Sequence, residues 1–226
     1  MNPATASARR WGYTVLVLLT LAAGAMDAIA FLRLGGVFTA NMTGNLILVA
    51  LAGSEDWQIR TLRSGLACVI FCVGVFAGFA MSGTGRGDGR WPPAVTRLIW
   101  ADFVLQLVFL VIWTRCGAVP GPALKFVLIA LASCAMGLQV AAARRVGIAG
   151  ISTAFVTGTL TSMVGSLVLR EPAEAACHAV IVSALAVGAL CSSLLLHLAP
   201  AWAGALPPVF LLLALVTVTS RLRDLA

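Results

Sequence analysis

The sequence predicts an all-α membrane protein, a single transmembrane domain over residues 1–226 built from two homologous repeats. Hydrophobic residues make up 61% of the chain and charged residues only 10%, whereas a soluble domain carries about a quarter charged residues. Apolar stretches of helical length recur from end to end. Because every backbone polar group in a bilayer needs an internal partner, such stretches predict spanning helices. The third observation is that one passage occurs twice.

The repeat is visible in two pairs of similar segments. Residues 17–26 read VLLTLAAGAM and residues 127–136 read VLIALASCAM, an offset of 110. Residues 39–46 read TANMTGNL and residues 153–160 read TAFVTGTL, an offset of 114. Repeats inside an apolar chain are common in secondary transporters.

The offset of 114 continues beyond these segments. It also relates Val73-Gly74 to Val187-Gly188 and Pro93 to Pro207. We therefore predict a first repeat over about residues 11–116 and a second over about residues 121–224.

Each repeat divides into about four apolar segments. Their expected bounds are about 11–34, 37–53, 64–82, 94–114, 121–143, 151–169, 176–199 and 207–221. Arg9 and Arg10 precede the first segment as in a signal peptide, but the segment is too long for a signal-peptide core. Its copy at 121–143 is internal, so both are expected to be mature membrane helices.

The second segment of each repeat is unusual. The sixteen residues 37–52 would give a helix of about 24 Å, shorter than the roughly 30 Å hydrocarbon core. Glycines precede both segments, at Gly35-Gly36 and at Gly147 and Gly150. The opening turns are polar, with Thr39, Asn41, Thr43, Gly44 and Asn45 in one repeat and Thr153, Thr157, Gly158 and Thr159 in the other.

These patterns predict that each second segment is broken or re-entrant and begins below the membrane surface. The first amides of a helix lack internal partners, and hydroxyl and amide side chains there satisfy that need. The positive end of the helix dipole would favour an anion or a carbonyl. The alternative is an ordinary spanning helix whose small polar residues allow close helix contacts.

The number of crossings decides the symmetry of the repeats. Three crossings plus a re-entrant segment per repeat would invert the second copy, whereas four crossings would leave the copies parallel. With the N-terminus in the cytoplasm, the inverted arrangement places ten of the fifteen bases inside and the parallel one nine. The positive-inside rule therefore favours inverted repeats and a cytoplasmic N-terminus by one residue.

Asp27 is the sharpest candidate for a functional residue, because it lies within the first apolar segment. A carboxylate at the centre of a membrane helix costs about 2.5–3.5 kcal/mol on insertion scales and usually marks an ion or proton route. The alternative is a structural role, capping a nearby helix or pairing with Arg33. The second repeat has Gly137 at the equivalent position, with Gln139 as the nearest polar residue.

Other polar residues are interpreted as structural. Asp102 and Gln106 lie one turn apart in the fourth segment, and Asp102 is expected at the interface beside Arg97. The six cysteines form no CxxC pair, and no histidine has metal-ligand spacing, so neither a metal nor another cofactor is expected. The net charge of +7 comes from arginines in the breaks between apolar runs, which indicates membrane topology rather than nucleic-acid binding.

The run MDAIAFLRLGGVFTANMTGNL at residues 26–46 resembles the YoaK family of bacterial multi-pass membrane proteins. The family has a similar D-A followed by G-x-F-T-A-N-x-T-G-N, and STAFVTGTLTSM at 152–163 resembles its second block. The resemblance covers nearly the whole chain. It implies a multi-pass protein of the bacterial plasma membrane, in a family catalogued as a domain of unknown function, and supplies no substrate.

These patterns favour a small-solute secondary transporter or channel, with the lipid bilayer and a small polar solute or proton as its partners. Its site would lie near the midplane between the two Thr-Gly segments, with Asp27 as the coupling carboxylate. The alternative is a non-transporting assembly or sensor component of the membrane. An enzyme is not expected, because the chain has no HExxH or GxSxG motif and no carboxylate pair at catalytic spacing. The sequence leaves the oligomeric state open.

Overall fold

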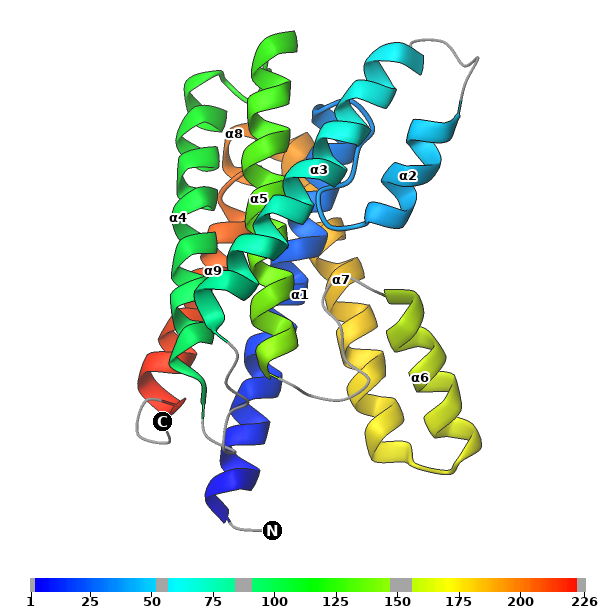
Figure 1. Ribbon diagram of the computed structural model, residues 1–226, viewed down its shortest axis with the longest axis vertical. Helices are drawn as coiled ribbons and strands as arrows, with labels where there is room; N and C mark the ends of the chain where they lie inside the picture. Colours follow the sequence, from blue (N-terminus) through cyan, green and yellow to red (C-terminus); the bar gives the residue numbers. More distant parts are fainter. Residues whose placement is uncertain (1–2, 52–56, 84–90, 147–155, 223–226) are drawn as a thin grey trace.

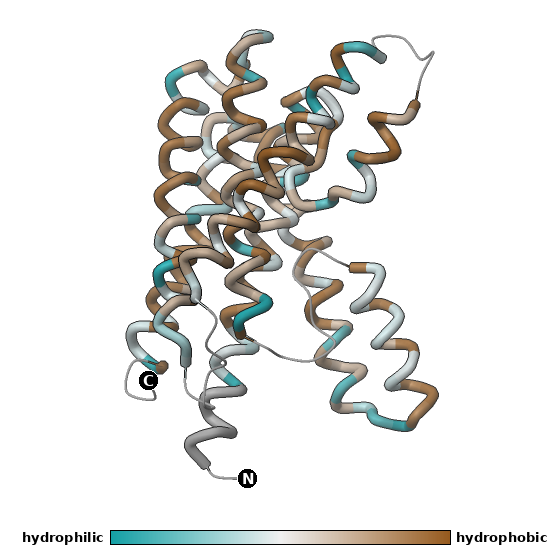
Figure 2. Tube along the Cα trace, viewed as in Figure 1, coloured by the Kyte–Doolittle hydropathy of each residue, from teal (hydrophilic) through white to brown (hydrophobic). Residues whose placement is uncertain are grey.

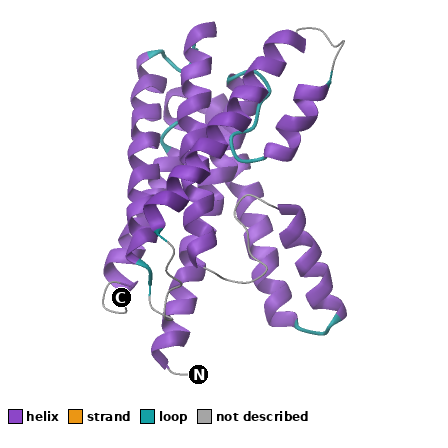
Figure 3. Cartoon of the chain, in the orientation of Figure 1, coloured by secondary structure: helices purple, strands orange, loops and turns teal. Residues whose placement is uncertain are grey.

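The computed structural model describes residues 3–51, 57–83, 91–146 and 156–222, and these residues form helices without any strand (Figures 1 and 3). Six helical stretches are long and apolar enough to cross a membrane, each 23–27 residues long. At 1.5 Å per residue, 23 residues extend about 35 Å, which exceeds the roughly 30 Å hydrocarbon core. The all-helical membrane class predicted from composition is therefore confirmed.

The long helices are α1 (Pro3–Arg33), α3 (Trp57–Ser82), α4 (Pro93–Arg115), α5 (Pro122–Val146) and α7 (Pro172–Leu198). The sixth span joins the short α8 (Pro200–Ala203), α9 (Leu206–Thr217) and the π-helical turn η1 (Val218–Leu222). Helices α4, α5 and α7 begin at proline. Proline fixes φ near the helical value and lacks an N–H that the first turn would leave unpaired, so these positions are favourable helix starts.

Two helices are too short to cross a membrane. Helix α2 (Met42–Ala50) has 9 residues and α6 (Val156–Val168) has 13, lengths of about 14 and 20 Å. In Figure 1, α2 occupies the upper half of the molecule and α6 the lower half, and each begins near mid-height. The prediction of shortened second segments therefore agrees with these helix lengths.

Several predicted bounds differ from the helices observed. The segment expected over 37–53 becomes helical only at Met42, because residues 34–41 form a separate loop. The segment expected over 64–82 begins at Trp57, and its first two turns include polar residues that a hydropathy pattern places outside the span. The last span begins at Pro200 rather than 207, since α8 precedes α9.

The six spans alternate in direction along the chain. Helices α1, α4 and α7 run from the lower to the upper end in Figure 1, and α3, α5 and α9 run in the opposite sense. Apolar residues dominate the middle of these helices, and hydrophilic residues gather toward their ends (Figure 2). Large apolar side chains such as Phe76, Leu194 and Val216 are exposed on the spans, so these helices contact the lipid bilayer.

Two helix crossings bring backbone against backbone. Helix α1 packs along α7, where Gly24 faces the carbonyl of Leu185 and Gly188 faces the carbonyl of Leu21. A Cβ atom on either glycine would overlap the facing carbonyl oxygen. Because small residues at an interface let helix axes approach closely, this pair of glycines fixes the crossing.

Helices α3 and α5 cross in the same manner. Gly74 of α3 faces the carbonyl of Cys134, and Gly137 of α5 faces the carbonyl of Phe71. Helix α5 also packs on α4, as α1 also packs on α9. The short helices lie on the outer sides of these pairs, α2 against α3 and α6 against α7. The core is therefore α1, α5 and their partners, and the short helices flank it.

Candidate functional site

The chain turns back into the molecule directly after α1. Helix α1 ends at Arg33, and the Gly36 amide donates to the carbonyl of Phe31 at 3.1 Å. Gly35 and Gly36 have φ values of 107° and 75°, which only glycine adopts without strain. The returning loop reaches back to Asp27, six residues and therefore about 9 Å below the end of α1. Residues 34–40 are thus folded back along the last turns of α1.

Asp27 holds this loop in place. Its Oδ1 atom accepts hydrogen bonds from the Thr39 amide at 2.6 Å, the Thr39 hydroxyl at 2.9 Å and the Ala40 amide at 2.9 Å. These donors precede the first turn of α2, where amides have no helical partner. The loop amides are satisfied by a carboxylate from the neighbouring helix, which explains how a polar loop is tolerated at this depth.

The proposed pairing of Asp27 with Arg33 does not occur in the structure. The Arg33 guanidinium instead donates to the carbonyl of Leu196 near the end of α7, at 3.2 Å. The capping alternative for Asp27 describes its contacts better, because its partners lie in the loop that leads into α2.

Asn45 fastens the same loop from the other side. Its amide nitrogen donates to the Phe38 carbonyl at 2.6 Å, and its carbonyl oxygen accepts from the Phe38 amide at 2.9 Å. Asn41 caps α2, since its side-chain oxygen accepts from the Gly44 amide at 3.2 Å. The Phe38 ring stacks on Phe31 of α1 with centroids 5.1 Å apart. The polar side chains of this motif therefore stabilise the folded conformation of the loop, and some of them also lie at the protein surface.

A cavity of about 1070 Å³ lies between α1, α2, α6 and α7. The first turns of both short helices contribute to its wall, so the positive ends of two helix dipoles face one space. Among the described wall residues, Asp27 is the acidic one. The wall comprises Gly24, Asp27, Ala28, Phe31 and Leu32 of α1; Phe38, Ala40 and Asn41 of the loop; Thr43, Gly44 and Ile47 of α2; Val156, Thr157 and Gly158 of α6; and Leu185, Ala189, Leu190 and Ser193 of α7.

The structure brings most of the predicted site residues to this cavity and leaves four described ones outside it. Asp27, Asn41, Thr43, Gly44, Thr157 and Gly158 line it. Thr39 of the loop and Asn45 of α2 are fully buried, and Thr159 is 1% exposed. Gln139 is buried elsewhere and donates to the carbonyl of Leu19 at 2.9 Å, which ties α5 to α1. Thr153 lies outside the described residues, as do Gly147 and Gly150.

The structure adds wall residues on α7 that motif analysis does not find. Leu185, Ala189 and Ser193 lie on α7 at successive intervals of four residues, so they share one helix face. Their spacing of four residues is the only feature of the sequence that could identify them as wall residues, and any buried helix face shows the same spacing. The cavity therefore combines polar groups at the two helix starts with largely apolar walls, as small-molecule sites generally do. Among the described residues, no three His, Cys, Asp or Glu side chains are grouped to hold a metal ion.

Comparison with known proteins gives two matches. The family model described as a protein of unknown function (DUF1275) matches residues 15–218. The chain is similar to the UPF0700 transmembrane protein YoaK of Bacillus subtilis (strain 168), with 37% identity over 182 residues, which covers 79% of each chain. No solved structure matches the chain at a significant level. The resemblance read from residues 26–46 is therefore confirmed.

Proposed function

The chain belongs to the DUF1275 family, and we propose that it is a small-solute secondary transporter or channel whose site is the cavity between α2 and α6. The observation that carries this proposal is that the first turns of both short helices line one cavity of about 1070 Å³. Half-helices whose N-terminal ends point at a midplane site are a recurring design of transporters. We propose no enzymatic activity, because the described wall residues include one carboxylate, Asp27, and neither histidine nor cysteine.

The proposal includes two inverted repeats, the first over about 11–116 and the second over about 121–224. Each helix pair has a counterpart: α1 on α7 corresponds to α5 on α3, α1 on α9 to α5 on α4, and α2 on α3 to α6 on α7. Helices α1 and α5 run in opposite directions, as do α2 and α6 (Figure 1). The glycines Gly74 and Gly188, related by the offset of 114, occupy the two backbone crossings. These correspondences support a twofold axis in the membrane plane.

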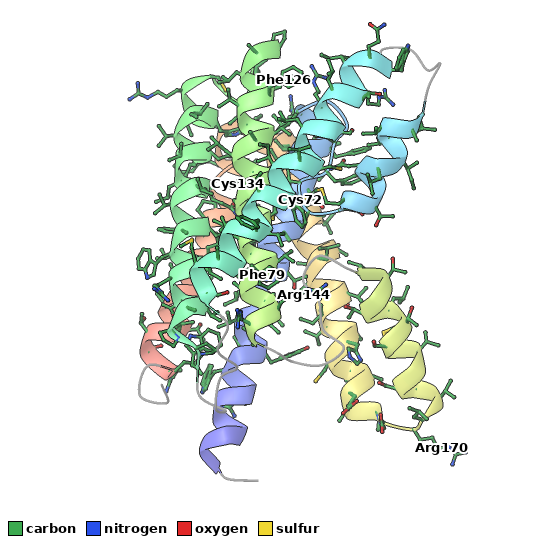
Figure 4. All side chains as sticks on the ribbon, viewed as in Figure 1. Cys72, Phe79, Phe126, Cys134, Arg144 and Arg170 are labelled. Atoms are coloured by element: carbon green, nitrogen blue, oxygen red, sulfur yellow. The ribbon has the colours of Figure 1, made fainter. Side chains whose placement is uncertain are left out.

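We place the chain in the bacterial plasma membrane with its N-terminus in the cytoplasm. With six spans, ten bases fall on the side of the N-terminus and five on the other, which agrees with the positive-inside rule. Arg144 lies near the lower end of α5 and Arg170 at the tip between α6 and α7, both at the end where α1 begins (Figure 4).

This orientation predicts which single cysteines an impermeant reagent reaches. In a variant without the six native cysteines, we expect Gln58→Cys at the start of α3 to react with an impermeant maleimide in intact cells. Glu174→Cys at the start of α7 should react only after permeabilisation, because the structure places these exposed residues at opposite ends of the spans. Labelling of both positions in intact cells contradicts three crossings per repeat, and the reversed pattern contradicts the orientation.

The transport proposal is tested by filling the cavity in proteoliposomes. Gly158 lines the cavity at the start of α6, and a Cβ atom there meets nothing within 4 Å. Gly158→Phe is therefore expected to abolish uptake of a solute found in a panel of small polar compounds, assayed with and without a pH gradient. The matched control is Gly165→Phe on the same helix, which is equally open but outside the cavity wall.

Equal uptake by the two variants would contradict the cavity as the site. If no compound in the panel crosses and the cavity excludes water-soluble probes, the non-transporting assembly or sensor role replaces the proposal. That Asp27 couples transport to a proton or cation stays a prediction, since its contacts also give it a structural role.

A further inference from the structure

A second carboxyl group lies in the core, away from the cavity. Asp102 is in the middle of α4 and is 0% exposed, and Gln106, one turn later, is 1% exposed. Helix α4 packs mainly against α5 and α9 and also contacts α3 and α8, and none of these helices contributes to the described cavity wall. The expectation that Asp102 lies at the interface beside Arg97 is wrong, because Arg97 is exposed whereas Asp102 faces the interior.

The hydrogen bonds of Asp102 are too few to stabilise a negative charge on its carboxyl group. Its Oδ1 atom accepts one bond, from the Gln106 amide nitrogen at 3.0 Å, and its Oδ2 atom has no partner. The Gln106 oxygen is also buried without a partner. Asp27, in contrast, accepts three bonds at one oxygen. An ionised carboxylate with a single bond from a neutral amide is costly inside a membrane protein.

The surroundings of Asp102 supply no compensating cation. On α5, the titratable residue near Asp102 is Cys134, whose thiol supplies no positive charge. The bases of α5 are at its ends, Lys125 nine residues and Arg144 ten residues from Cys134, about 14–15 Å along the helix. Helices α8 and α9 contain no charged residue, and the bases of α3, Arg60 and Arg63, lie in its first two turns. No arrangement of the described groups therefore neutralises an ionised Asp102.

We propose that Asp102 and Gln106 form a proton-binding site, in which Asp102 carries a proton while α4 is packed on α5 and α9. The proton comes from a hydronium ion: one of its O–H bonds breaks and leaves water, and an O–H bond forms on the carboxylate, which becomes a neutral acid. Gln106 suits both states of this site. Its amide nitrogen donates to the charged form, and after a rotation of the amide its oxygen accepts from the acid.

Loss of this proton is linked to movement of α4. Cys134 lies at mid-height of α5, beside α4 (Figure 4), and its carbonyl contacts Gly74 at the α3–α5 crossing. The charged form of Asp102 requires water, and water reaches this fully buried group only if α4 separates from the helices packed on it. The proton is therefore retained in the packed conformation and released when the helices open.

The test is infrared spectroscopy of the full chain in a lipid membrane. At pH 7 we expect the carbonyl stretching band of a protonated carboxyl group, with an intensity that corresponds to one such group per chain. Asp102→Asn should remove the band, whereas the matched control Asp27→Asn, which changes the other buried aspartate, should retain it. A wild-type protein without the band, or a band lost in Asp27→Asn instead, overturns the proposal.

A second variant keeps the proposal testable if Asp102→Asn does not fold. Gln106→Leu leaves the carboxyl group in place and removes its only hydrogen-bond partner among the described residues. The band should persist and move to higher frequency, because the carboxylic acid loses its hydrogen bond to Gln106. A band at the wild-type frequency shows that the protonated group is not the partner of Gln106 and overturns the assignment.

Discussion

Gly74→Ala is expected to destroy the α3–α5 crossing. A Cβ atom at Gly74 would overlap the backbone carbonyl of Cys134, and a backbone group in a packed helix cannot rotate away as a side chain can. Overpacking a well-packed core costs about 1–3 kcal/mol and occasionally more. Because Gly137 makes the reciprocal contact with the Phe71 carbonyl, separation of the helices loosens both contacts. We expect a large loss of thermal stability in detergent, measured by unfolding or by time-dependent aggregation.

The matched control is Gly65→Ala on the same helix. A Cβ atom at Gly65 meets nothing within 4 Å, and alanine is a better helix former than glycine by about 1 kcal/mol. Gly65→Ala should therefore be neutral or stabilising, opposite in sign to Gly74→Ala. Equal effects of the two substitutions would show that helix propensity, not close approach, decides the response at Gly74.

The α1–α7 crossing gives the same comparison independently. Gly188→Ala should be as damaging as Gly74→Ala, because Gly188 faces the carbonyl of Leu21. Sequence comparison alone relates these two glycines through the offset of 114, but it does not say why glycine is needed. That reason depends on which helix lies opposite each glycine, and partners far apart in the sequence are not visible in a local pattern.

The sequence predicted the short second segments better than the residues lining the site. Gly35-Gly36 and the polar turn that follows indicated the break, because both the glycines and the side chains capping α2 act locally. Thr39 and Asn45 share the motif with Thr43, yet both are buried, Thr39 in the loop and Asn45 in α2, whereas Thr43 lines the cavity. The direction of each side chain depends on how the loop folds back on α1, which composition does not encode.

For Asp102, the sequence analysis predicted an interfacial position for a residue that is buried in the core. Its distance of five residues from Arg97 suggested a position near the interface, but helical periodicity turns the two side chains to different faces. The face of α4 that carries Asp102 also carries Leu98, Ile99, Gln106 and Phe109, all buried. Two polar residues on an otherwise apolar helix face indicate a buried polar pair. The spacing of Asp102 and Gln106 was the only feature of the sequence that could have revealed this pair.

Asp27→Ala is expected to release the loop that precedes α2 and to abolish the proposed transport. The substitution leaves the amides of Thr39 and Ala40 and the Thr39 hydroxyl without their acceptor. A buried donor left unsatisfied costs about 1–3 kcal/mol. Leaving two amides unsatisfied therefore lowers the local stability of the loop by at least about 2 kcal/mol. This changes the equilibrium constant for opening of the loop by more than a factor of ten. Hydrogen exchange of the peptide that contains residues 38–41 should accelerate by at least that factor.

Asp27→Asn separates the structural role from the charge. Asparagine retains a side-chain oxygen that accepts from the same amides, so the loop should stay protected from exchange, and Thr39→Val should show only the smaller loss of one hydroxyl. If the charge couples solute movement to a proton, Asp27→Asn removes the pH dependence of uptake while the loop remains folded. Unchanged flux and unchanged pH dependence in this variant would leave Asp27 as an anchor alone. Rapid exchange in Asp27→Asn but not in Asp27→Ala would contradict the anchoring itself, since only the alanine variant lacks an acceptor.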